Sequence, residues 1–322
     1  MKADVIDKLL EDILEGSYSG LPVLAMAGRV ANMLQFAASL RGKLGYQGEI
    51  ELFATDPDAA IGLTCVRPCE AVADMRSKVL VVVEDDDKES VLATARGFLP
   101  DAGATILVAG YGHYAFRDQR YRAIVDSLLV PSIANGYPNC QIHIYQCLEN
   151  AAKLNLDGCV AEFGVFKGGT TRFIAEVIGA LGKSWPIYGF DTFEGFPLRR
   201  SPLDMYSHPG AEYSRFSMVS QYLSDTNIEL VKGDIIETAS LLRGKEMVLT
   251  FVDTDNYSAA HAALSSVIES TLVGGAIVLD HFTGGARFRY TVGERTAANE
   301  LLVTDSRYFN LHGTGVFMRC AR

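Results

Sequence analysis

One stretch of the sequence, residues 158–171, constrains the fold more than any other. It reads Gly-Cys-Val-Ala-Glu-Phe-Gly-Val-Phe-Lys-Gly-Gly-Thr-Thr, a short apolar run that ends at an acid and is followed by glycines. Apolar residues at 173, 174, 177, 178 and 181 then recur on one helical face. The order of strand, glycine turn and helix predicts the first crossover of a Rossmann-like parallel sheet. In such a crossover the N-terminus of the helix and the bare glycine backbone can hold a polar ligand.

Length and composition fit two domains of ordinary size, since the chain has 322 residues and is 48% hydrophobic. The formal net charge is −10 and no stretch is rich in lysine and arginine, so we expect no nucleic-acid partner. The first residues lack the basic start and apolar core of a signal peptide, and no apolar run reaches the length of a membrane span. We therefore expect a cytoplasmic protein without a membrane partner, whose six cysteines are reduced thiols.

Strand and helix patterns alternate over residues 1–130 and predict a smaller parallel α/β domain that precedes the second one. The expected strands are 21–27, 49–54, 78–83 and 104–109, and the expected helices are 3–15, one that ends near 44, 89–98 and 118–129. The helix at 3–15 has an apolar stripe. This stripe either packs on its own domain, which is the favoured interpretation, or is exchanged with a second subunit.

The first domain has no dinucleotide-binding motif, because Gly28 stands alone where Gly-x-Gly-x-x-Gly would be needed. Asp56, Asp58 and the acidic run 84–87 follow strands and could meet a ribose or hold a cation. Acids are also expected at such places as turn residues and near helix N-termini. The role of this domain is therefore left open by the sequence.

Residues 131–139 contain two prolines, a glycine and two asparagines and predict a linker, so that 131–154 comprises this linker and a helix at about 141–153. The second domain is expected over 155–322. Its further strands are expected at 186–190, 228–231, 247–252 and 276–279, with a helix before the last of them that stops at Gly274-Gly275. A helix near 295–303 and strands near 307–310 and 315–319 are expected to follow. The connection 197–224 is long, polar and aromatic, which is typical of a functional lid or a disordered loop.

An acid directly follows each of five apolar runs of the second domain: Glu162, Asp191, Asp234, Asp253 and Asp280. Ligands bind outside the carboxyl ends of the strands in an open parallel sheet, so these acids predict one binding crevice. The alternative is that the acids cap the helices that follow. Capping would suit Asp234 and either Asp253 or Asp255, but not all of the acids.

Several motifs occur in order: Glu-Phe-Gly-Val-Phe-Lys-Gly-Gly-Thr from 162, Phe-Asp-Thr-Phe-Glu-Gly-Phe-Pro from 190, Lys-Gly-Asp-Ile from 232, Val-Asp-Thr-Asp-Asn-Tyr from 252 and Gly-Gly-Ala-Ile-Val-Leu-Asp-His-Phe from 274. Over about residues 155–305 the chain resembles the macrocin O-methyltransferase (TylF-type) family. These enzymes use S-adenosylmethionine to methylate hydroxyls on sugars and related natural products, usually with Mg²⁺. The resemblance implies a Rossmann-like class I methyltransferase domain, a small hydroxylated substrate and a homo-oligomer.

Carried over by position, the resemblance implies a cofactor site. The residues expected around the methionine part of S-adenosylmethionine are Glu162, Gly164, Gly168, Gly169 and Thr170. Asp191 would accept hydrogen bonds from the ribose hydroxyls, and Asp234 would lie near the adenine amino group. Asp253 and Asp280 would bind the metal.

The chain departs from the family at one ligand position, because the family commonly has two adjacent acids where this sequence has Asp280-His281. Two acids and a histidine can still hold a divalent ion, so the predicted metal ligands are Asp253, Asp280 and His281. Imidazole would shift the preference from Mg²⁺ toward Mn, Fe, Ni or Zn. Alternatively, the metal has been lost and His281 acts as a general base.

Methyl transfer requires an aligned acceptor oxygen and removal of its proton. We expect Asp253 and His281 to be the catalytic residues, and we expect substrate contacts from the lid at Tyr206, His208 and Arg215. The leading prediction is an S-adenosylmethionine-dependent O-methyltransferase for a sugar or another small natural product. The alternatives are a nitrogen acceptor or a different reaction on the same cofactor, and a non-catalytic interaction protein that binds S-adenosylmethionine.

Overall fold

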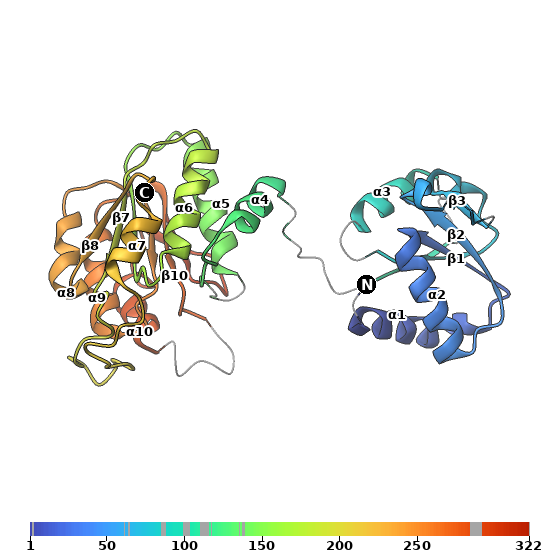
Figure 1. Cartoon of the computed structure of the whole chain (residues 1–322), viewed down its shortest axis with the longest axis horizontal. Coiled ribbons are helices and arrows are strands. Elements are labelled where there is room, and N and C mark those ends of the chain that lie inside the picture. The colour runs from blue at the N-terminus through green and yellow to red at the C-terminus, as the bar shows by residue number, and fades with distance from the viewer. Residues whose placement is uncertain are drawn as a thin grey trace. The chain divides into compact units, whose positions relative to one another are not determined.

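In the computed structural model the chain forms two compact units, Met1–Ala115 and Phe116–Arg322 (Figure 1). The structure describes all residues except 2, 61, 64, 85–87, 99–103, 110–115, 117, 135, 137, 138, 284–291 and 322, and it leaves out the side chains at 95, 96 and 98. The division lies before the boundary expected near residue 130. Helix α4 (Gln119–Ser127) belongs to the second unit because Tyr121 and Ile124 are buried in that unit's core.

The first unit is a parallel sheet of five strands in the order β3-β2-β1-β4-β5, as the alternation of strands and helices predicted. Its strands are β1 (Val23–Gly28), β2 (Glu49–Ala54), β3 (Val66–Pro68), β4 (Val79–Val82) and β5 (Thr105–Val108). Its helices are α1 (Ala3–Glu15), α2 (Val30–Leu44) and α3 (Lys88–Phe98), with 3-10 turns η1 (Tyr18–Gly20), η2 (Pro57–Ala60) and η3 (Cys69–Asp74). Alternate strand residues face two cores, one shared with α1 and α2 and the other with η3 and α3. The stripe of α1 is thus buried in its own unit.

Two acids at strand ends of the first unit accept hydrogen bonds from backbone N–H groups at the start of α2. Asp56 Oδ1 accepts a hydrogen bond from Val30 N at 2.8 Å, and Glu84 Oε2 accepts one from Arg29 N at 3.2 Å. Asp58 is exposed in η2, and residues 85–87 of the acidic run lie outside the described residues. Asp56 and Glu84 therefore act as caps, which is one of the two alternatives that the sequence left open.

The second unit is a sheet of seven strands in the order β11-β12-β10-β9-β6-β7-β8. Its strands are β6 (Cys159–Phe163), β7 (Ile187–Asp191), β8 (Ile228–Lys232), β9 (Met247–Val252), β10 (Thr271–Leu279), β11 (Tyr308–Asn310) and β12 (Val316–Arg319). The other helices are α5 (Cys140–Lys153), α6 (Gly169–Ala180), α7 (Phe216–Tyr222), α8 (Ile235–Thr238), η4 (Ala239–Leu242), α9 (Tyr257–Val267) and α10 (Val292–Leu301). Strands β6 to β10 pair in parallel and β12 and β11 are antiparallel, so the Rossmann-like fold is confirmed.

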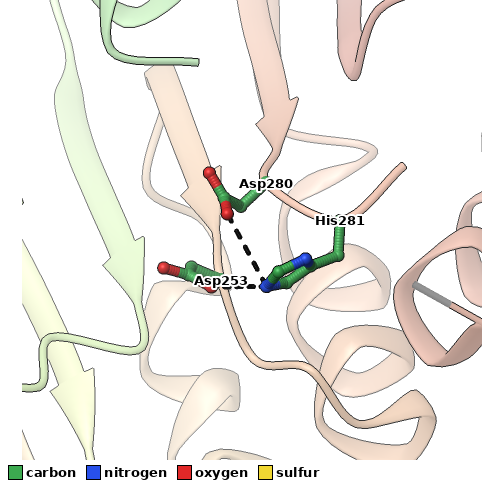
Figure 2. Close-up of side chains that lie close together, drawn as sticks. All are labelled: Asp253, Asp280 and His281. Atoms are coloured by element: carbon green, nitrogen blue, oxygen red, sulfur yellow. Dashed lines mark ion pairs between the residues drawn. The ribbon is translucent and has the colours of Figure 1, made fainter. Parts of the chain in front are cut away.

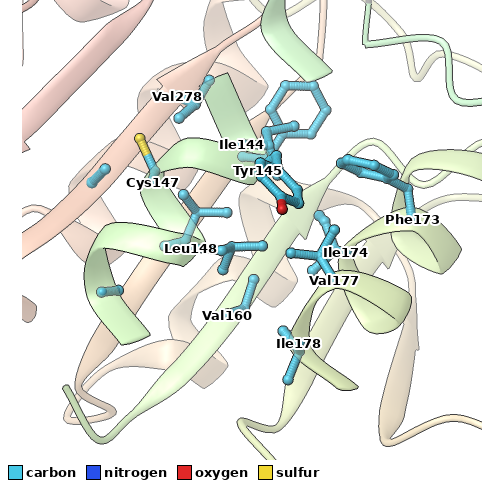
Figure 3. Close-up of a cluster of buried hydrophobic side chains, with 14 of the residues drawn as sticks. Ile144, Tyr145, Cys147, Leu148, Val160, Phe173, Ile174, Val177, Ile178 and Val278 are labelled. Atoms are coloured by element: carbon cyan, nitrogen blue, oxygen red, sulfur yellow. The ribbon is translucent and has the colours of Figure 1, made fainter. Parts of the chain in front are cut away.

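Helices cover both faces of this sheet. Figure 3 shows the face on which Leu148 of α5 and Phe173 and Val177 of α6 meet Val160 of β6. The opposite face packs against α8, α9 and α10. Strand β6 therefore lies in the middle of the sheet with both of its faces covered, and its five residues are all buried.

Strand β10 begins earlier than the sequence predicted. Its first residue is Thr271, and it runs through Gly274 and Gly275, where the sequence predicted the end of a helix. A β-carbon on Gly275 would lie 2.8 Å from the carbonyl oxygen of Val248, so glycine is needed there for close approach to β9. The pairing with β9 shifts register between Thr271 and Ala276.

Among the described residues, no helix combines the length and the apolar character that crossing a bilayer requires.

Candidate functional site

A cavity of about 340 Å³ lies at the carboxyl ends of the parallel strands of the second unit. Gly164, Asp191 and Asp234, which the resemblance assigned to the cofactor, line this cavity, and so does Asp253. The assigned cofactor residues that are not in its lining are Glu162, Gly168, Gly169 and Thr170. A crevice is therefore present at the strand ends, but only some of the residues assigned to the cofactor line it.

Asp191, the last residue of β7, joins two turns that line the cavity. Its Oδ2 atom accepts a hydrogen bond from Phe166 N at 2.8 Å, and its Oδ1 atom accepts one from Phe193 N at 2.8 Å. Both phenylalanines have positive φ angles, 52° and 53°, which cost a non-glycine residue about 1–2 kcal/mol. The carboxylate thus holds both turns in strained conformations and retains lone pairs for further donors.

The glycines of the first turn are required by neighbouring protein atoms. Gly164 has a φ of 99°, and a β-carbon on it would lie 1.9 Å from the carbonyl oxygen of Asp253. A β-carbon on Gly169 would lie 2.1 Å from the carbonyl oxygen of Pro131. Gly168 is the N-cap of α6 with a φ of 81°. At Gly164 and Gly169 the space left by the missing side chain is therefore taken by protein backbone.

Glu162 on β6 is buried, and its Oε2 atom has no hydrogen-bond partner among the described residues. Burial raises the pKa of this carboxyl well above its ordinary value, and the charges of Asp253 and Asp191 add to the shift, while the Thr171 hydroxyl opposes it. A buried oxygen without a partner is costly in a folded protein. Such an atom is suited to accept a hydrogen bond from a bound ammonium group.

Asp234 and Thr170 already have protein partners. Asp234 Oδ1 accepts a hydrogen bond from Ile236 N at 3.0 Å as the N-cap of α8. Its Oδ2 atom lies 2.8 Å from Arg200 Nη2. The Thr170 hydroxyl lies 2.9 Å from the Ser132 hydroxyl. The capping alternative is thus realised at Asp234, although this acid also lines the cavity.

A cluster of Asp253, Asp280 and His281 lies at the ends of β9 and β10 (Figure 2). One ligand-type atom from each residue lies within 4.8 Å of the others. His281 Nε2 is 3.5 Å from Asp253 Oδ1 and 3.6 Å from Asp280 Oδ2. These are the three residues that the sequence predicted as metal ligands, and the fold brings them together.

Two further acids, which the sequence motifs did not assign to the site, belong to this cluster. Asp255 Oδ1 lies 3.0 Å from His281 Nε2, and Asp255 also lines the cavity with a φ of 58°. Glu294 of α10 is buried and accepts hydrogen bonds from Asp255 N and His281 N, each at 2.9 Å. Asp255 could have been found from its place in the Val-Asp-Thr-Asp motif. Glu294 gave no such signal, because a glutamate in a helix usually faces solvent.

The carboxyl groups around His281 determine its protonation state. Burial raises the pKa values of Asp253 and Asp280, and it raises that of Glu294 to about 7. Burial alone would lower the pKa of His281, but hydrogen bonds to Asp253 and Asp255 raise it to about 12. The imidazole is therefore protonated at neutral pH in this arrangement and acts as an ion-pair partner.

The segment expected to be a linker, 131–139, contributes to the site where the structure describes it; residues 135, 137 and 138 lie outside the described residues. Gly136 N donates a hydrogen bond to Asp280 Oδ1 at 2.8 Å. Ile133 lines the cavity, and Ser132 contacts Thr170. The described part of this segment is thus fixed against the second unit.

The segment between β7 and α7 forms another wall of the cavity through Phe196, Pro197, Tyr213 and Ser214. The three substrate contacts expected in this region are not in the lining: Tyr206, His208 and Arg215. Arg215 instead pairs with Glu212 at 3.2 Å on the surface, and His208 Nδ1 lies 3.0 Å from the Tyr213 hydroxyl.

The match to a known protein family lies within the second unit. The family model for macrocin O-methyltransferase (TylF) matches residues 139–319. The solved O-methyltransferase NovP is 16% identical, with 56% of this chain and 79% of NovP covered and a TM-score of 0.45. The calicheamicin methyltransferase CalS11 is 20% identical, with 63% of this chain and 91% of CalS11 covered and a TM-score of 0.44. No curated protein sequence matches the chain. The family match takes in every strand of the second unit, and the chain belongs to the TylF macrocin O-methyltransferase family of S-adenosylmethionine-dependent enzymes.

Proposed function

We propose that the second unit transfers a methyl group from S-adenosylmethionine to a hydroxyl of a sugar or another small natural product. The observation that carries this proposal is the position of Asp253, which belongs both to the cavity wall and to the cluster with Asp280 and His281. A cofactor held beside Asp191 and an acceptor hydroxyl held beside the cluster, at different parts of the cavity lining, would meet at this residue. Family membership supports the reaction class.

The residues of the cavity fit the cofactor. Phe166, Phe193 and Ile235 offer apolar walls, and Asp191 offers carboxylate lone pairs for the ribose hydroxyls. Glu162 is not in the lining, but its buried Oε2 atom has no partner among the described residues, and the ammonium group of the methionine part would supply one. S-adenosylmethionine, when bound, supplies the electrophilic methyl group. The protein's task is then to orient the acceptor oxygen and to remove its proton.

The cluster also fits a divalent cation, because two carboxylates and an imidazole lie close enough to act as ligands together. Asp253, Asp280 and His281 would hold the ion, and Asp255 and Glu294 would add negative charge around it. A bound cation would lower the pKa of the acceptor hydroxyl. Mg²⁺ is the expected ion, and the imidazole widens the range toward Mn²⁺ and Zn²⁺.

We assign the removal of the acceptor proton to a carboxylate on the cavity wall. Asp253 lines the cavity, and burial raises its pKa, which brings a carboxylate closer to the range of an effective general base. In the metal-free cluster His281, with a pKa of about 12, would hold a positive charge instead of accepting the proton; as a metal ligand it would be neutral, and the ion would supply that charge. Of the two residues expected to share the work, Asp253 would therefore take the proton and His281 would balance the acids.

The first experiment is calorimetric titration of the metal-stripped full chain with S-adenosylmethionine and S-adenosylhomocysteine, repeated with Mg²⁺, Mn²⁺ and Zn²⁺. Binding at one site per chain, weakened in Asp191→Ala, is the expected result. Absence of binding under every condition would overturn the proposal.

Methyl transfer is then measured with a labelled cofactor on glycosylated acceptors. Pairs of sugars that differ only in a hydroxyl or an amino group at one position separate oxygen from nitrogen acceptors. Asp253→Asn is expected to lower turnover by roughly 100-fold or more, as loss of a general base does. Asp225→Asn is the matched control, because Asp225 pairs with Arg172 on the surface, away from the cavity. Tight cofactor binding without transfer to any acceptor would favour a non-catalytic binding protein.

A further inference from the structure

We infer that Asp204 is a positioning residue for the acceptor, because it fastens the cavity wall of residues 192–215 to the turn that carries Asp253 and Asp255. This inference rests on the proposed function and names the residue that fixes the acceptor side of the site.

The wall in question, here called the β7–α7 segment (residues 192–215), is described throughout and contains neither a helix nor a strand. It lines the cavity in two stretches: the first contains Thr192, Phe193, Gly195, Phe196 and Pro197, and the second contains Tyr213 and Ser214. Its backbone forms hydrogen bonds within the segment, such as His208 N to Phe196 O at 2.9 Å, and side chains fix it against the rest of the unit. The part between the two lining stretches is where such anchors occur.

Asp204 is the strongest of these anchors. It is 3% exposed, and its carboxylate accepts four hydrogen bonds. Oδ1 accepts from Ser258 N at 2.8 Å, and Oδ2 accepts from the Ser258 hydroxyl at 2.9 Å. Oδ2 also accepts from Arg200 N at 2.8 Å and Ser201 N at 2.9 Å. One carboxylate thus joins the turn at residues 200–204 of the β7–α7 segment to the first turn of α9.

The environment keeps this carboxylate charged. Burial alone would raise the pKa of Asp204, but the hydrogen bonds, of which that from Ser258 N is the largest, hold the pKa below its ordinary value. The N-terminus of α9 also favours a negative charge at this place. Asp204 therefore acts as a fixed anchor at neutral pH.

A second contact beside Asp204 points to the same arrangement. Asn256 Oδ1 accepts a hydrogen bond from Tyr206 N at 2.9 Å, and Asn256 Nδ2 donates one to Tyr206 O at 2.9 Å. Asn256 directly follows Asp255 in the chain, and both line the cavity. The wall is therefore held against the same turn that carries the acids, so displacing the wall would change its distance from them.

The start of the same segment, which lies on the cofactor side at Phe193, is held by a different carboxylate. Asp191 holds the turns at Phe166 and Phe193. The link from Asp204 to that side runs through Arg200, whose guanidinium pairs with Asp234 and is 44% exposed. Exposed ion pairs of this kind contribute little. Loss of the Asp204 anchor should therefore weaken binding of the acceptor and leave the affinity for the cofactor almost unchanged.

The test is Asp204→Asn in the full chain, which keeps the size of the side chain but turns an amide NH₂ group toward hydrogen-bond donors. With an acceptor from the methyl-transfer screen, we expect kcat/KM to fall roughly 10- to 100-fold, mainly through the acceptor KM. The dissociation constant of S-adenosylhomocysteine should change by less than about threefold, since Asp191 and its hydrogen bonds to Phe166 N and Phe193 N are kept in the variant. Hydrogen exchange should become faster at the amides of Arg200, Ser201 and Ser258.

Glu212→Gln is the matched control, because Glu212 lies in the same segment but pairs only with exposed Arg215. Ser258→Ala, which removes one of the four hydrogen bonds, should give a smaller change in the same direction and serves if Asp204→Asn does not fold. An unchanged kcat/KM, or an equal loss of S-adenosylhomocysteine affinity, would overturn the positioning role. Absence of transfer by the wild type would overturn the proposed function and the acceptor role together, whereas unchanged hydrogen exchange in Asp204→Asn would overturn the anchoring alone.

Discussion

Replacing Asp191 by alanine tests the central link between fold and cofactor binding in this protein. The change removes the acceptor of two hydrogen bonds, from Phe166 N and Phe193 N, each at 2.8 Å. A hydrogen bond to a charged group contributes about 1.5–3 kcal/mol. The two turns can relax from their positive φ angles in the variant, so we expect a net loss of roughly 2–4 kcal/mol. For a unit of this size, this corresponds to a decrease in Tm of about 4–16 °C.

Cofactor affinity should fall as well, because the ribose would lose its acceptor and the turns would have to be ordered on binding. We expect the dissociation constant of S-adenosylhomocysteine to rise on the order of 100-fold. Scanning calorimetry with and without ligand and isothermal titration measure the two effects, with Asp225→Ala as the surface control. A Tm within about 2 °C of the wild type would show that the carboxylate does not hold the turns. An unchanged dissociation constant would show that Asp191 does not contact the cofactor.

Three further predictions concern other parts of the second unit. Gly164→Ala should lower the free energy of unfolding by roughly 3 kcal/mol or more in urea denaturation, because a β-carbon there would lie 1.9 Å from the carbonyl oxygen of Asp253 at a φ of 99°. His281→Asp should raise the preference for Mg²⁺ over Zn²⁺ by about tenfold or more in competitive titration, since it gives an all-oxygen ligand set. The hydrogen bond that Asp305 accepts from Arg307 lowers the pKa of the Asp305 carboxyl from 3.8 to about 2. This carboxylate therefore stabilises the fold above pH 3.8, and its contribution is lost as the pH falls toward 2. Asp305→Asn should therefore flatten the acid limb of the pH–stability curve, measured by urea denaturation between pH 2 and 5, and an unchanged curve would contradict this assignment.

The sequence predicted the parallel strands and the place of the crevice well. In a buried parallel strand the apolar run is nearly continuous, which is why 247–252 could be identified with correct limits. Parallel strands also bring their carboxyl ends to one edge, so the order of strands and acids along the chain was enough to predict a crevice. Asp191, Asp234 and Asp253 line it, whereas Glu162 and Asp280, which were expected there too, are not in its lining.

Close approaches between distant segments could not be predicted in the same way. Gly275 looks like a helix stop in the sequence, but it lies inside β10. Glycine is needed there because a β-carbon would lie 2.8 Å from the carbonyl oxygen of Val248. Gly136 lies in what looks like a linker, yet its N–H group donates to Asp280. A glycine signals that a side chain is missing, but the sequence does not tell whether solvent, a ligand or another strand occupies the space.

Negative charges surround His281, which occupies a position where the resemblance to the family implies a second acid. Asp253, Asp255 and Asp280 all lie within 3.6 Å of His281 Nε2, and Glu294 holds the backbone of the same turn. A second acid at this position would add a negative charge to a buried group of acids, and a bound cation would offset that cost. A histidine provides a positive charge from within the chain and remains able to act as a ligand. The substitution therefore allows the cluster to persist without metal while retaining the donor atoms that a metal requires.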